Sequence, residues 1–103
     1  MDKLKIEQDI LKVLKNIYDP EIPVNIYDLG LIYEIIVSDD AEVEITMTLT
    51  APNCPVADEL IEQVKEGVKE VSGIKDVNIK LTFEPSWDMN YLSEEAKLEL
   101  GML

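Results

Sequence analysis

The fold is decided by residues 31–50, LIYEIIVSDDAEVEITMTLT, in which a short polar stretch separates an apolar run from an alternating one. β-branched and aromatic residues dominate 31–37, which predicts a strand buried on both faces apart from Glu34. Apolar and polar residues alternate over 42–50, which predicts a second strand with one buried face. Residues 38–41 favour a turn, so we expect the two strands to form an antiparallel hairpin.

A helix is expected before this hairpin. Apolar residues recur at helical spacing over about 3–17, with lysines and acids between them. Pro20 and Pro23 should end this helix, because a proline biases the residue before it away from helical geometry. Residues 24–30 show no clear period and are expected to form an ordered loop with one helical turn ended by Gly30.

After the hairpin, the pattern predicts a helix, a strand and a short helix. Pro55 should open the first of these helices, which ends at Ser72-Gly73. Alternation over 77–83 predicts a third strand, and a right-handed crossover would make it parallel to the second. Ser93 is expected to cap a final helix over 94–100.

The order α-β-β-α-β-α predicts an α/β fold of the two-layer α+β kind, with helices packed on a small, mixed, three-stranded sheet. The chain has 103 residues, which suits one domain over residues 1–103. A chain of this size buries about two-thirds of its unfolded surface, so no disulfide or metal is needed to hold the fold.

Composition excludes several functions. Nine lysines against 22 acidic residues give a net charge of −13, and the sequence has no arginine and no histidine. This balance argues against binding to nucleic acid or to anionic membranes. The absence of histidine excludes Ser-His-Asp and Cys-His catalysis. A single cysteine excludes internal disulfides, and no signal peptide or long apolar run is present, so a cytoplasmic location is expected.

The single cysteine, Cys54, lies in the segment Thr50-Ala51-Pro52-Asn53-Cys54-Pro55. If Pro55 is the first helical residue, Cys54 is the N-cap, where the free N–H groups of the first turn would stabilise a thiolate. The alternative is a buried, inert cysteine that only fills the core. A position between two prolines at a strand-to-helix junction favours the functional interpretation.

Two further features are candidates for a site. Asp19-Pro20-Glu21-Ile22-Pro23 holds two acids between prolines, although spacing alone favours acids that simply face water. Trp87 is the only tryptophan, and such a residue more often closes the edge of a core than anchors a partner.

Thiolate and carboxylates together suit a bound cation, because the cation relieves their mutual repulsion. One cysteine cannot complete an iron or cluster site. The remaining ligands would have to come from a second subunit, a partner protein or a small thiol.

These segments, together with residues 26–33 (IYDLGLIY), Thr50 and Cys54-Pro55, resemble the SufT/PaaD-like family of MIP-type iron–sulfur cluster assembly domains, formerly a domain of unknown function. The resemblance runs from about the first helix to residues 93–95. It implies a compact α/β domain that matures iron–sulfur proteins as a carrier or adaptor in cluster delivery. It also implies partnership with iron–sulfur assembly proteins and client apoproteins, and it allows a homodimer.

The resemblance maps the family's candidate site onto four residues: Asp19, Glu21, Thr50 and Cys54. Asp28 lies close in sequence, and Asn53 and Trp87 are candidates for a supporting or partner-binding role. Ala51 and Asn53 depart from the family, where threonine or serine and glycine are frequent. Asn53 tolerates a left-handed turn, so the loop geometry survives, whereas Ala51 cannot supply a hydroxyl.

The leading hypothesis is a non-enzymatic iron–sulfur assembly factor. Cys54 would ligate iron or a cluster transiently, with no permanently bound cofactor. Two alternatives stay open: an adaptor that binds assembly proteins without contacting metal, and an enzyme that uses Cys54 as a nucleophile. The enzyme ranks last because neither a base nor an oxyanion site is visible in the sequence.

Overall fold

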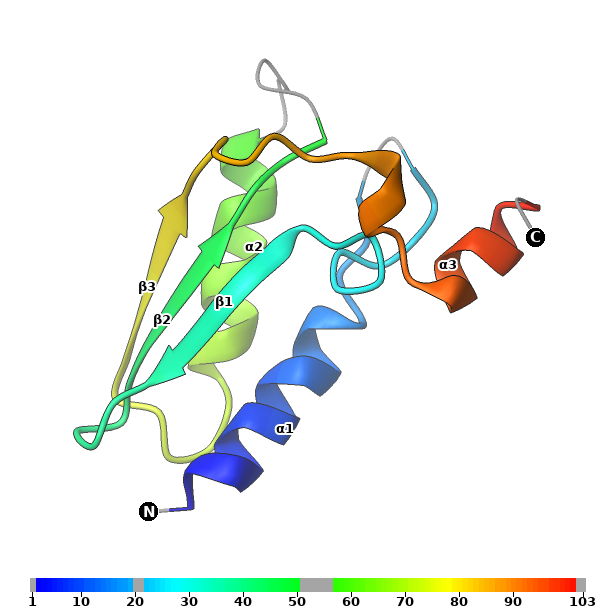
Figure 1. Ribbon diagram of the computed structural model, residues 1–103. Helices are drawn as coiled ribbons and strands as arrows, with labels where there is room; N and C mark the ends of the chain where they lie inside the picture. Colours follow the sequence, from blue (N-terminus) through cyan, green and yellow to red (C-terminus); the bar gives the residue numbers. More distant parts are fainter. Residues whose placement is uncertain (1, 20–21, 51–56, 102–103) are drawn as a thin grey trace.

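The computed structural model describes residues 2–19, 22–50 and 57–101. Its elements in these ranges are, in order, α1 (Lys3–Leu14), β1 (Ile32–Val37), β2 (Glu42–Met47), α2 (Ala57–Lys69), β3 (Asp76–Leu81), a 3-10 helix (Met89–Tyr91) and α3 (Glu94–Glu99) (Figure 1). The predicted α-β-β-α-β-α order is confirmed. Among these helices, none is long and apolar enough to cross a membrane.

The strands described form one mixed sheet in the order β1-β2-β3. β1 and β2 pair antiparallel, and β2 and β3 pair parallel, as the hairpin and the crossover predict. The hairpin turn uses Ala41 at φ +62, the left-handed geometry that a tight reversal needs. The register of β1 on β2 shifts between Ile32 and Glu34, which marks a β-bulge.

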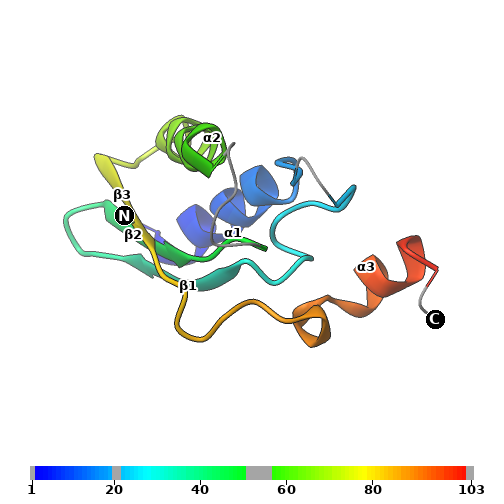
Figure 2. The same cartoon turned by 90° about the horizontal axis from the view of Figure 1, so that it is seen from above.

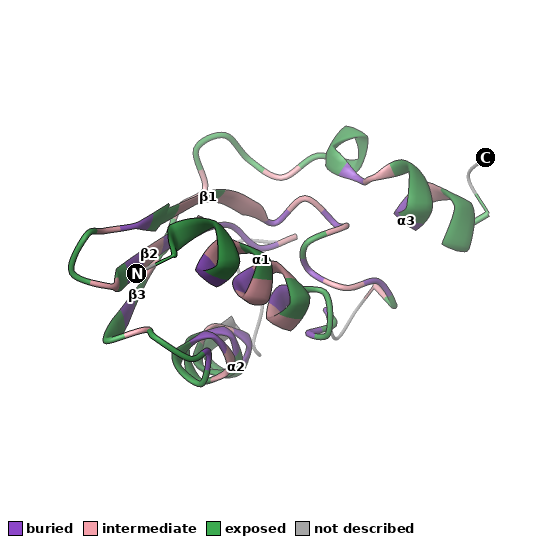
Figure 3. Ribbon diagram, turned by 90° about the horizontal axis from the view of Figure 1, so that it is seen from below, coloured by how far each residue is buried: buried purple, intermediate pink, exposed green. Residues whose placement is uncertain are grey.

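Helices α1 and α2 cover one face of this sheet, which gives the two predicted layers (Figure 2). Buried residues lie on one side of each of these helices, whereas α3 is largely exposed (Figure 3). In the core, the inward side chains of the strands pack against the buried faces of α1 and α2. Its fully buried members include Ile10, Leu14, Ile45, Met47, Val64 and Val68.

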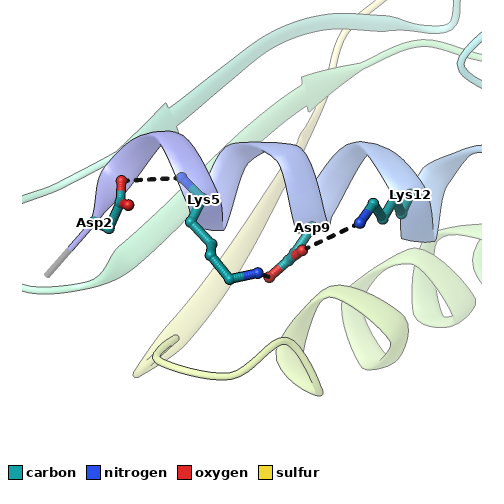
Figure 4. Close-up of polar contacts among 4 residues, drawn as sticks. All are labelled: Asp2, Lys5, Asp9 and Lys12. Atoms are coloured by element: carbon teal, nitrogen blue, oxygen red, sulfur yellow. Dashed lines mark hydrogen bonds and ion pairs between the residues drawn. The ribbon is translucent and has the colours of Figure 1, made fainter.

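Helix α1 begins with a cap and ends earlier than predicted. The Asp2 carboxylate accepts a hydrogen bond from the Lys5 backbone N–H at 3.2 Å, and exposed Lys5–Asp9 and Lys12–Asp9 pairs follow along the helix (Figure 4). The expected end near residue 17 is wrong, since α1 ends at Leu14. The next residues tighten into i→i−3 hydrogen bonds, and Ile17 stays buried outside the helix.

The strands are shorter than the alternation suggests. β2 ends at Met47 rather than at residue 50, and β3 ends at Leu81, directly opposite Met47, rather than at 83. The alternating residues beyond these points have no continuous ladder partner. Burial of β1 on both faces is also wrong, because Ile36 is 47% exposed on the face that the helices do not cover.

A C-terminal strap, residues 82–93, returns on the side of the sheet away from α1 and α2 (Figure 2). The Tyr33 hydroxyl donates a hydrogen bond to the Pro85 carbonyl at 2.8 Å. The Tyr33 ring also meets the Tyr91 ring edge to face, with centroids 6.1 Å apart. The strap is therefore fastened to the beginning of β1, although the two segments lie far apart in the sequence.

Candidate functional site

The structure describes only part of the site that the sequence predicts. It places Asp19, Asp28, Thr50 and Trp87, whereas Glu21, Asn53 and Cys54 lie outside the described residues. The expected position of Cys54 at the cap of the second helix lies outside them as well, and so does the expected role of Pro55 as its first residue.

Asp19 closes a tight turn after α1. Its carboxylate accepts a hydrogen bond from the Ile22 backbone N–H at 3.0 Å, and its own N–H donates to the Val24 carbonyl at 3.3 Å. The side chain is buried, with only 6% of the residue exposed. The expectation that this acid simply faces water is therefore wrong. Local hydrogen bonding explains how a carboxylate is tolerated there.

Asp19 and the end of β2 are held by the same segment, residues 24–31. Ile26 donates its backbone N–H to Ile17, the second residue before Asp19, at 2.9 Å. Leu31 donates to Ile26 at 3.2 Å and accepts from Thr48 at 2.8 Å. This relay of backbone bonds ties the Asp19 turn to the strand that leads into half-exposed Thr50.

Asp28 stabilises that segment through a reciprocal pair with Asn25. The Asn25 amide donates to the Asp28 carboxylate at 2.7 Å, and the Asp28 backbone N–H donates to the Asn25 side-chain oxygen at 2.9 Å. These contacts stabilise the turn at residues 25–28; a role of Asp28 in supporting the site stays a prediction. Asn25 was missed by the sequence reasoning, although its three-residue spacing from Asp28 is typical of a capped turn.

Trp87 locks the strap onto the same segment. Its indole N–H donates to the Leu29 carbonyl at 2.7 Å, and the ring packs against the core. A further bond, from the Ser93 backbone N–H to the Asp28 carbonyl at 2.8 Å, fixes the end of the strap. The interpretation of Trp87 as a residue that closes the core edge is supported by these contacts. A contact with a partner protein stays a prediction.

Thr48 is a second residue whose position the sequence did not reveal. It was grouped with the polar face of the second strand, yet it is fully buried. Among the described residues its hydroxyl has no hydrogen-bond partner of good geometry. The pKa of the nearby Tyr33 phenol is raised, mainly by burial and to a smaller extent by the charge of the Tyr91 phenol. The Thr48 side chain acts in the opposite direction and lowers this pKa.

We expect Thr48→Val to leave stability unchanged or to raise it by about 1 kcal/mol, because valine keeps the shape and removes a buried hydroxyl that has no well-formed hydrogen bond among the described residues. Urea unfolding monitored by Trp87 fluorescence measures this change. Thr46→Val, at a half-exposed position on the same strand, is the matched control. A loss of stability in Thr48→Val would mean that the hydroxyl is satisfied in solution.

Asp19 can be tested for a role beyond its turn. Asp19→Asn keeps an oxygen that can accept from Ile22, so its stability should fall by less than about 1 kcal/mol, whereas Asp19→Ala should lose about 1–2 kcal/mol. If the carboxylate also ligates iron or polarises groups beside it, Asp19→Asn should stay folded but lower the maturation of a client iron–sulfur enzyme severalfold. Maturation that follows stability alone in both variants would leave Asp19 with a structural role only.

Within residues 2–19, 22–50 and 57–101, no three Cys, His, Asp or Glu side chains are grouped so that they could hold a metal ion. Ligation of iron by Cys54, with help from Asp19 and Glu21, stays a prediction. The described geometry provides a hydrogen-bonded support, built from residues 24–31 and the strap, at the end of the sheet where β2 runs toward Thr50.

Comparison with known proteins shows that residues 7–81 match the model of a family described as "Iron-sulfur cluster assembly protein". A relative from Porphyromonas gingivalis, named "Fe-S protein maturation auxiliary factor", is 59% identical over 97% of this chain and 95% of its own. The SufT auxiliary factor of Staphylococcus aureus is 35% identical over 84% of this chain and 98% of its own. The crystal structure of a domain of unknown function from Bacillus anthracis superposes with a TM-score of 0.89 at 29% identity, covering 97% of this chain and 95% of that one.

Proposed function

Because the chain belongs to the iron–sulfur cluster assembly protein family, we propose that it works in the cytoplasm as a non-enzymatic factor that carries iron or a cluster to client proteins. The observation that carries this proposal is the extent of the family match. Residues 7–81 include both the Asp19 turn and the segment from Thr50 to Cys54. The names of the relatives, which are maturation auxiliary factors, support the same role.

Iron or a cluster is the cargo in this proposal. Cys54 supplies the thiolate, which is the ligand that iron–sulfur clusters prefer. Asp19 and Glu21 supply carboxylates that ligate iron or orient groups beside it, and Thr50 holds the loop. One thiolate per chain binds a cluster weakly unless a second molecule adds ligands. Weak binding suits a protein that must transfer its cargo to a client.

The partners proposed are iron–sulfur assembly proteins and client apoproteins. A chain of net charge −13 attracts basic surfaces and repels other acidic ones, so encounters with basic partners should be fast at low salt. The alternative function is an adaptor that binds these partners without touching metal. The net charge of the chain is the observation that favours this alternative. Binding between an adaptor and its partners should weaken strongly as salt is added, since salt screens exposed charges over about 8 Å at physiological ionic strength.

The proposal is tested in cells that lack the protein. The iron content and the activity of an endogenous iron–sulfur enzyme should fall in these cells and recover with the wild-type chain. The amount of the client polypeptide, measured by immunoblot, should stay constant. Unchanged iron content in the client would contradict a role in maturation, while a fall in client polypeptide alone would indicate an effect on expression.

A further inference from the structure

In the part of the chain that the structure describes, the edge of the sheet formed by β1 has no strand beside it. Among the described residues, β1 is an outer strand that pairs only with β2. Ser38 donates its backbone N–H to Glu42 at 2.8 Å, and Ile36 stands opposite Glu44 two residues along. Because the bonding direction alternates along an antiparallel strand, the N–H and C=O groups of Ile35 and Val37 point away from β2.

The part of the β1 edge formed by Ile35–Val37 lacks the usual protection against pairing with another strand. Natural edge strands are blunted by lysines, prolines or bulges. The bulge of β1 lies between Ile32 and Glu34 and protects only the other half. No lysine or proline occurs in β1, whereas β3, at the opposite edge, carries exposed Lys80.

A hollow of about 270 Å³ lies over the sheet near the hairpin, and β1 forms one side of it. Side chains of β1, β2 and β3 line it where they project from the uncovered face of the sheet, and exposed Ile36 gives it an apolar wall. The lining carries three acids and no basic residue; its side chains beside Ile36 include Ser38, Glu42, Glu44, Asp76 and Asn78.

The charges decide which occupant fits. A second copy of the chain would bring another net charge of −13 and another Glu34 to the same edge. We propose that the Ile35–Val37 edge docks an extended segment of a partner protein that carries lysine or arginine at alternate positions. The segment adds a strand to β1, and its backbone bonds to Ile35 and Val37.

The geometry gives each part of such a segment a place. Alternate side chains of an added strand project on the uncovered face, about 5 Å from Ile36. The alkyl stem of a lysine or arginine lies along Ile36, and its charged end reaches toward Glu44 on the next strand. The hairpin end of the sheet, where this happens, lies opposite the end at which β2 runs toward Thr50 (Figure 1). Docking at Ile35–Val37 is therefore placed away from Thr50, and it requires nothing of Cys54.

The test uses the full chain and a short fluorescein-labelled peptide of alternating valine and lysine. A second peptide is identical except for N-methyl groups on the amides that would face β1, and a third has glutamate in place of lysine. We expect N-methylation to weaken binding about tenfold or more, because it removes two backbone hydrogen bonds. The glutamate peptide should not bind. Binding should shift the amide resonances of Ile35 and Val37 in NMR spectra.

Variants of the protein complete the test. Glu44→Gln should weaken the lysine peptide about two- to fivefold, in line with a single exposed ion pair. Glu70→Gln, at an exposed position after α2, is the matched control and should have no effect. Equal binding of the N-methylated peptide, shifts mapped away from β1, or no binding at all would overturn the proposal. A dimer in sedimentation that Ile36→Lys dissociates would also overturn it, since the occupant would then be a second copy.

Discussion

Replacement of Cys54 with serine is expected to lower client maturation to the level of cells that lack the protein. Serine is close to cysteine in size, so the fold should be preserved. Its hydroxyl, however, stays protonated at neutral pH and is a poor ligand for a cluster that prefers soft thiolate. The measurement is the iron content of an endogenous iron–sulfur enzyme, with the variant and the wild type expressed at equal levels.

A thiol placed elsewhere is the control for this variant. Ser86→Cys combined with Cys54→Ser keeps one cysteine per chain but moves it to the exposed strap. This double variant should stay as inactive as Cys54→Ser alone. Full maturation by Cys54→Ser would remove the thiolate from the mechanism and leave the adaptor as the better account.

Among the four glycines of the chain, replacement of Gly30 with alanine is expected to lower stability the most. Gly30 has φ +81, and a Cβ there would lie 2.5 Å from the Tyr91 carbonyl oxygen and 2.7 Å from the Tyr91 Cβ. Left-handed strain costs about 1–2 kcal/mol, and crowding adds about 1–3 kcal/mol, so we expect a loss of about 2–5 kcal/mol. Urea unfolding measures it.

The strap should report this change directly. Because Tyr91 cannot stay in place, the Trp87 bond to Leu29 should loosen, and the emission of the only tryptophan should shift to the red. Gly101→Ala is the matched control: Gly101 has φ +74, and no atom of the described residues lies within 4 Å of an added Cβ, so this variant isolates the backbone strain. Equal losses in the two variants would contradict a tight contact between the strap and Gly30.

The fold was largely predictable because local patterns and packing agree. The alternation over 42–50 and the turn residues 38–41 specify a hairpin, and the crossover rule then orients the third strand. The errors have a common cause. Periodicity shows which side chains alternate, but it does not show where a ladder partner ends, as at Met47 and Leu81, or which strand lies at an edge, as with Ile36.

The candidate site was predictable in residue identity and not in environment. The sequence singled out Asp19 and Trp87, but it could not show that the Asp19 carboxylate is buried in its own turn. Nor could it show that the strap returns over residues 28–33, because that contact joins segments more than 50 residues apart. Long-range contacts of this kind leave no local periodicity.

Anaerobic reconstitution of the purified chain with iron and sulfide tests the central claim most directly. Absorbance and bound iron are compared between the wild type and Cys54→Ser. The account predicts uptake that depends on Cys54, with less iron per chain than a complete cluster of its own requires, because one thiolate per chain must share its cargo. Equal uptake by both proteins, or none by either, would contradict a carrier that holds iron through Cys54.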